Sequence, residues 1–104
     1  MKFQRNGYAR KYRYGITIKM DKQAVGTIGW QTSMDASKTG MRVSLRVQDT
    51  ESACGWKNIT LKKTFEGFSD REQGKAAKEW VKSNWSEIAK IHRIAPLTEQ
   101  PTML

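Results

Sequence analysis

Residues 69–94, SDREQGKAAKEWVKSNWSEIAKIHRI, are the longest stretch of the chain with a regular helical pattern. At about 100° per residue, the large apolar side chains fall on one side and most charged side chains on the other. Ser69, with Glu72 three residues later, fits a capping box at the start of a helix, and Pro96 provides a stop after its end. We therefore expect one long C-terminal helix that needs an apolar partner. Its apolar side holds Ala77, Trp80, Val81, Trp85, Ile88 and Ile91.

The residues before this helix alternate between apolar and polar side chains, which is the pattern of half-buried strands. The alternation is clearest in residues 41–48, and weaker forms of it occupy residues 12–20, 25–32 and 56–65. The sequence thus predicts an α+β fold, in which a three- or four-stranded antiparallel sheet packs on one long C-terminal α-helix. In the best strand Met41, Val43, Leu45 and Val47 point inward, and Arg42, Ser44, Arg46 and Gln48 point outward.

The length of 104 residues is typical of a single domain. We expect residues 1–11 to form a basic N-terminal arm, residues 12–95 the sheet-and-helix domain, and residues 96–104 a short C-terminal tail. The arm carries four cations around the flexible Asn6-Gly7 pair.

Nineteen Lys and Arg residues against ten Asp and Glu residues give a net charge of +9 at pH 7. A charge of this size favours a polyanionic partner, nucleic acid before a membrane surface. The mean hydropathy of -0.73 leaves no segment for a membrane span, and the N-terminus lacks the apolar run of a signal peptide. The single cysteine, Cys54, excludes an internal disulfide and is typical of a reducing, cytoplasmic setting.

The sequence shows no pattern typical of an enzyme. No Gly-rich phosphate loop precedes a helix, and no carboxylates are paired in a recognisable motif. One cysteine and one histidine, His92, do not supply the ligand set of a zinc site. We therefore expect a non-enzymatic protein with no metal site and no cofactor.

The outward side of the predicted sheet collects cations and neutral polar side chains without a carboxylate. Arg and Lys reach phosphates and guanine edges, whereas Asn and Gln pair with adenine. A shift of one residue in the strand register would move this whole set to the other face. The candidate nucleic-acid-binding residues are Arg10, Lys11, Arg13, Lys19, Arg42, Arg46 and Lys62.

The order of strands and helix resembles the AP2-type domain and the arm-type DNA-binding domain of tyrosine integrases. The resemblance spans about residues 12–88 in layout and rests on an aromatic strand end, a polar cap and small residues before a tryptophan: Phe65, Phe68, Ser69, Glu72, Ala76, Ala77 and Trp80. In those families a small antiparallel sheet lays its exposed face in the major groove. This chain departs from them in its expected four strands, its longer loops and the absence of a following integrase catalytic domain. By position, the resemblance implies that Arg13, Lys19, Arg42 and Arg46 face the groove.

The function that we expect is binding of double-stranded DNA through the sheet face and the arm. The main alternative is a small phage- or plasmid-type regulator that docks on an acidic surface of a host protein, since small size and positive charge fit that equally. Binding of RNA or single strands is a third possibility and depends on Trp56 and Tyr8 for base stacking. Three other aromatic residues, Tyr12, Tyr14 and Trp30, fall on the inward side and are expected in the core.

Overall fold

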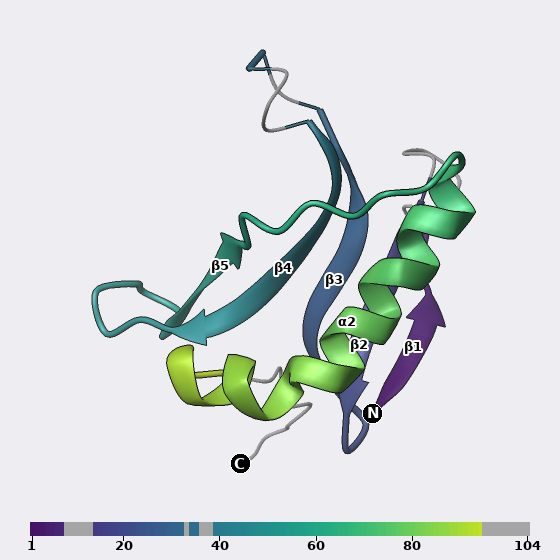
Figure 1. The fold of residues 1–104 in the computed structure, drawn as a ribbon. Coiled ribbons are helices and arrows are strands. Elements are labelled where there is room, and N and C mark those ends of the chain that lie inside the picture. Colours follow the sequence, from purple (N-terminus) through teal and green to yellow (C-terminus); the bar gives the residue numbers. More distant parts are fainter. Residues whose placement is uncertain (8–13, 33, 36–38, 95–104) are drawn as a thin grey trace.

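A computed structural model describes residues 1–7, 14–32, 34–35 and 39–94 of the chain. These residues form one antiparallel sheet and one helix, so the predicted α+β class is confirmed (Figure 1). The sheet has five strands in the described part rather than three or four, and neighbours in sequence are neighbours in space. The elements are β1 (Lys2–Arg5), β2 (Gly15–Met20), β3 (Gln23–Gln31), β4 (Gly40–Gln48), β5 (Trp56–Thr60) and α2 (Asp70–Ile91).

Strand β1 lies in the segment that the sequence assigned to a free arm. Residues 2–5 pair with β2, and Phe3 lies opposite Ile18 and packs against the core. A four-residue strand with one large apolar side chain is too short to show an alternating pattern in the sequence. The strand forms because the edge of β2 would otherwise leave its backbone groups unpaired. Residues 2–5 are therefore part of the sheet, and residues 8–11 of the expected arm lie outside the described residues.

The start of α2 agrees with the predicted capping box. The Ser69 hydroxyl accepts a hydrogen bond from the backbone N–H of Glu72 at 3.2 Å. The Glu72 carboxylate accepts one from the backbone N–H of Phe68 at 2.8 Å, one residue before the expected donor. Both bonds satisfy backbone groups that have no partner within the helix.

The end of α2 comes earlier than the sequence predicted. The helix ends at Ile91, with His92 as its C-cap. Arg93 then accepts a hydrogen bond from the backbone N–H of Gln48 at 2.7 Å, and Ile94 forms an isolated bridge with Val47. Pairing with β4 thus replaces the last helical turn that the apolar pattern had suggested.

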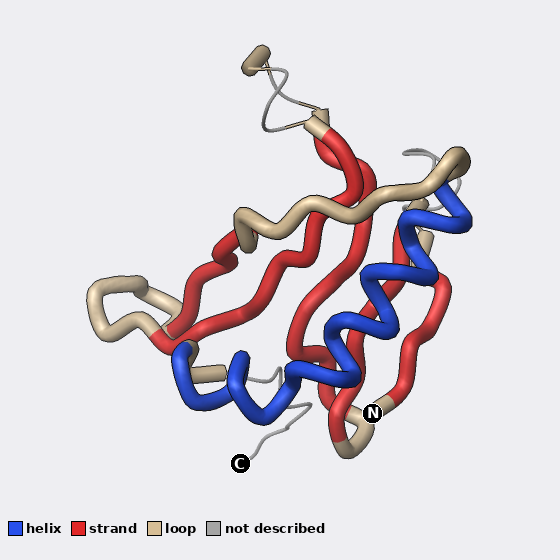
Figure 2. The backbone as a smooth tube through the Cα atoms, viewed as in Figure 1, coloured by secondary structure: helices blue, strands red, loops and turns tan. Residues whose placement is uncertain are grey.

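Helix α2 lies across one face of the sheet (Figure 2). The core lies between the helix and this face. The inward positions predicted for residues 41–47 are confirmed, and the tryptophans of α2 are half-buried at the border of the core. Ile91 is 71% exposed, so its predicted place in the core is wrong; Ile94 packs there instead. The buried apolar residues are Ile16, Ile18, Val25, Ile28, Met41, Val43, Leu45, Val47, Ala77, Val81 and Ile88.

Gly74 allows the helix and the sheet to approach closely. A Cβ atom at this position would overlap the ring of Tyr14, which reaches α2 from the start of β2. Glycine in a helix costs about 1 kcal/mol relative to alanine, so the contact with the tyrosine ring is what explains its presence here. Tyr14 is on the inward side, as the sequence predicted.

A bulge in β3 adds one more buried side chain to the core. The register between β2 and β3 shifts between Ile18 and Lys19, which leaves Val25 as the extra residue. Val25 is 2% exposed, so the additional side chain is buried.

No helix in the described part of the chain is both long enough and apolar enough to cross a membrane.

Two isoleucines one turn apart on α2 provide a matched test of this packing. We expect Ile88→Ala to lower the free energy of unfolding by about 2–5 kcal/mol, because it leaves a cavity in the core. The same change at the exposed Ile91 should alter it by no more than about 0.5 kcal/mol. Urea denaturation of both variants measures the difference, and equal losses would contradict the helix orientation described above.

Candidate nucleic-acid interface

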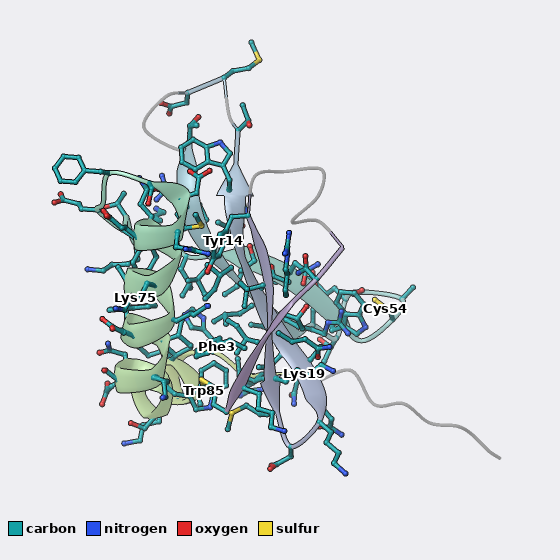
Figure 3. All side chains as sticks on the ribbon, turned by 90° about the vertical axis from the view of Figure 1, so that its right-hand side faces the viewer. Phe3, Tyr14, Lys19, Cys54, Lys75 and Trp85 are labelled. Carbon is teal, nitrogen blue, oxygen red and sulfur yellow. The ribbon has the colours of Figure 1, made fainter. Side chains whose placement is uncertain are left out.

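The face of the sheet opposite α2 bears no other described helix (Figure 3). Strand alternation places every second side chain on this outward face. The pairing register aligns one such residue from each strand in a row across the sheet: Gln4, Thr17, Thr27, Ser44 and Thr60.

Hydrogen bonds link this row into a polar surface. The hydroxyls of Ser44 and Thr60 lie 3.1 Å apart, and the Gln31 amide donates to Ser44 at 3.0 Å. At the other end, the Asn6 amide donates to the Thr17 hydroxyl at 3.2 Å. Within the row, Ser44 and Thr60 thus contact each other, and side chains beside the row contact Ser44 and Thr17.

The charge on the strands has one sign. Together β1 to β5 contain six Lys and Arg residues and no Asp or Glu residue. The sequence predicted a carboxylate-free outward face, and this holds for the described strands. Four of the cations stand at outward positions in the register: Lys2, Lys19, Arg42 and Arg46.

Lys2 and Lys19 lie directly opposite each other on β1 and β2. Like charges in this arrangement destabilise a sheet unless an anion compensates them. A shallow hollow beside them is lined also by Met1, Gln4, Asp21 and Lys22, so one carboxylate stands among several cations. This corner of the sheet is accordingly positive, and Lys2 is a candidate that the arm prediction did not place on the sheet.

Arg46 is held on the outward face by stacking. Its guanidinium carbon lies 4.0 Å from the centre of the Trp56 ring. Trp56 is the first residue of β5 and lies on the same outward face, opposite Gln48. The nitrogen Nη1 of Arg46 is buried and has no hydrogen-bond partner among the described residues. Arg46 is thus a cation that the described part of the sheet leaves without an acceptor.

Arg42 occupies an outward position but is only 5% exposed, so the expectation that it faces a groove is corrected. Its Nη1 donates a hydrogen bond to the backbone carbonyl of Lys63 at 3.1 Å. Lys63 belongs to the segment that leaves β5 and crosses over the sheet to α2 (Figure 1). Carbonyls in such a segment lack a strand partner, and the guanidinium of Arg42 supplies a donor.

The remaining predicted residues have different positions. Lys19 is partly exposed on β2, and Lys62 is exposed just after β5. The structure therefore places Lys19 and Arg46 on one sheet face. Arg10, Lys11 and Arg13, and also the aromatic Tyr8 and Tyr12, lie outside the described residues.

Asn58 was not among the predicted binding residues, although its outward parity was visible in the sequence. It is exposed and lies directly opposite Arg46 on the neighbouring strand. The signal that could have selected it is cross-strand position, which a sequence without a known register does not provide.

Cys54 lies in the turn beside this surface and is exposed. Its sulfur is 3.1 Å from the Ser52 hydroxyl and 3.3 Å from the backbone oxygen of Trp56. The hydrogen bond with Ser52, then the backbone at Trp56 and, more weakly, the charge of Arg46 lower the pKa of the Cys54 thiol. The described residues contain no cluster of three or more His, Cys, Asp or Glu side chains that could hold a metal ion.

Comparison of the chain with protein-family models, with curated proteins and with solved structures finds no match. The resemblance to AP2-type and integrase arm-type domains therefore stays a prediction.

Arg42 and Arg46 should differ in their effect on stability. We expect Arg42→Ala to cost about 1.5–3 kcal/mol, because it removes a charged hydrogen bond to the linking segment. Arg46→Ala removes a stacking contact worth about 0.5–1 kcal/mol. Equal midpoints for the two variants in urea denaturation would show that Arg42 does not hold this segment.

The reactivity of Cys54 tests the effect of its neighbours. Since the thiolate is the reacting form, a lowered pKa gives faster alkylation near neutral pH. Ser52→Ala removes the largest cause of the shift, so the pH midpoint of the alkylation rate should move upward. Iodoacetamide labelling between pH 6 and 10 measures both midpoints, and an unchanged midpoint would exclude the role assigned to Ser52.

Proposed function

We propose that this protein binds nucleic acid without catalysis, with duplex DNA as its target, through the sheet face opposite α2. The observation that carries the proposal is an outward face without a carboxylate in its described strands, on which Lys2, Lys19 and Arg46 stand, and the Nη1 of Arg46 has no hydrogen-bond partner among the described residues.

A solvated sheet face would be expected to mix charges of both signs, because opposite charges across strands stabilise pairing. Here none of the ten acidic residues of the chain lies in a described strand. The net charge of +9 adds long-range attraction for a polyanion. Release of condensed counterions from DNA would then supply much of the binding free energy.

The stacking of Arg46 on the Trp56 ring favours duplex DNA over single strands as the target. Proteins that bind single strands need exposed aromatic faces on which bases stack. One face of the Trp56 ring is already covered by Arg46. Strands β4 and β5 pair at one edge of the five-stranded sheet. The major groove is wide enough to admit a two-stranded ribbon, such as this edge pair would present to it.

We propose no chemical step for His92 or Cys54, whose side chains are of types often used in catalysis. His92 forms the C-cap of α2, and its backbone N–H donates to the carbonyl of Ile88 at 2.9 Å. Cys54 contacts Ser52 and the backbone of the same turn.

The salt dependence of DNA binding tests which face of the molecule contacts the DNA. We expect Lys2→Ala with Lys19→Ala to weaken binding to all duplexes alike and to lower the salt slope by about two, or one per lost phosphate contact. The control is Lys75→Ala with Lys82→Ala, which removes the same charge from exposed positions on α2. Figure 3 shows Lys19 and Lys75 on opposite sides of the sheet. Fluorescence anisotropy with a labelled duplex from 25 to about 300 mM salt provides the slopes.

If the α2 control loses as much affinity as the sheet variant, binding does not occur through the sheet face. If the wild-type protein binds no duplex, single strand or RNA at low salt, the proposal fails, and docking on an acidic protein surface becomes the function to test.

A further inference from the structure

Arg46 and Asn58 occupy directly opposed positions on β4 and β5, both on the outward face. Side chains in such a pair have Cβ atoms about 4.5–5.5 Å apart. Successive bases along a DNA strand are about 3.4 Å apart. The two side chains can therefore reach neighbouring base pairs from one ribbon.

The contacts of Arg46 within the protein determine which of its guanidinium nitrogens are left to bind a ligand. Trp56 stacks on the guanidinium, and Nη1 is its one nitrogen that is both buried and unpartnered. Nε and Nη2 are not among the buried side-chain atoms without a partner, and Arg46 as a whole is half-buried. These two nitrogens form a planar pair of donors, and that pair matches O6 and N7 of guanine.

Asn58 offers a different pattern at the adjacent position. Its side chain is exposed and stands directly opposite Arg46. A carboxamide presents one acceptor and one donor side by side, which matches N6 and N7 of adenine.

We propose that Arg46 and Asn58 form a base-reading pair for a guanine and a neighbouring adenine in the major groove. This inference rests on the proposed binding of duplex DNA. Trp56 is the positioning residue of this pair. By stacking on the guanidinium it restricts the rotation of a long side chain, so that less freedom is lost when the bidentate contact forms.

The test is selection from a duplex pool with a randomised centre, followed by anisotropy titration of the selected sites. The wild-type protein should enrich sites with adjacent guanine and adenine. Arg46→Lys should lose the preference at the guanine and Asn58→Ala at the adenine, each by about 5- to 150-fold on the preferred site. Lys57→Ala is the matched control, because it removes a charge from the same ribbon at a position facing the other side, and it should keep both preferences.

A double-mutant cycle tests Trp56. We expect Trp56→Leu to reduce the guanine preference several-fold when Arg46 is present and to have no further effect in the Arg46→Ala background. Thermal unfolding of each variant establishes that binding is compared between folded proteins. Equal effects of Trp56→Leu in both backgrounds would show that Trp56 does not act through Arg46.

The outcomes also distinguish this inference from the function on which it rests. Binding to random duplexes without enrichment of the two bases would overturn the reading pair and leave duplex binding intact. A uniform loss on all duplexes in Arg46→Ala, with a salt slope lower by about one, would make Arg46 a phosphate contact and overturn base reading. Absence of all duplex binding by the wild-type protein would overturn both.

Discussion

The packing of α2 against one face of the sheet is the constraint on which the other features depend. A lone amphipathic helix is marginal in water, and an antiparallel sheet needs one covered face. Val81 and Ala77 of the helix and Leu45 and Val43 of β4 are all fully buried in this contact. Because the helix covers only one face, the alternation of each strand leaves a second, polar face exposed on the other side.

Strong periodicity made the central part of this fold predictable. The 22 residues of α2 and the alternating residues of β4 carry patterns that tertiary structure does not override. The sequence could not show β1, since a strand of four residues at an edge is stabilised by its neighbour rather than by its own pattern. It also could not show that Ile94, rather than Ile91, completes the core, because that depends on pairing between residue 94 and β4.

The sequence predicted which face of the sheet the candidate residues occupy, but it did not predict how exposed each of them is. Strand alternation placed Arg42 and Arg46 on the same side, as the register shows. Their environments differ because the chain after β5 passes near Arg42 and offers it a carbonyl, whereas Trp56 lies beside Arg46 and offers it a ring. Such differences come from segments distant in sequence. Composition and periodicity contain no information about them.

The separation of the two faces has a consequence for how this protein can evolve. Outward residues of β4 and β5 such as Arg46 and Asn58 contribute little to the core, so their identity is only weakly tied to folding. Substitutions there can accumulate and recombine while the inward residues keep the chain folded. Arg42 is the exception on β4, since its side chain is buried and bonded to the linking segment. Related chains could thus diverge in the ligand they recognise along β4 and β5 while sharing one scaffold.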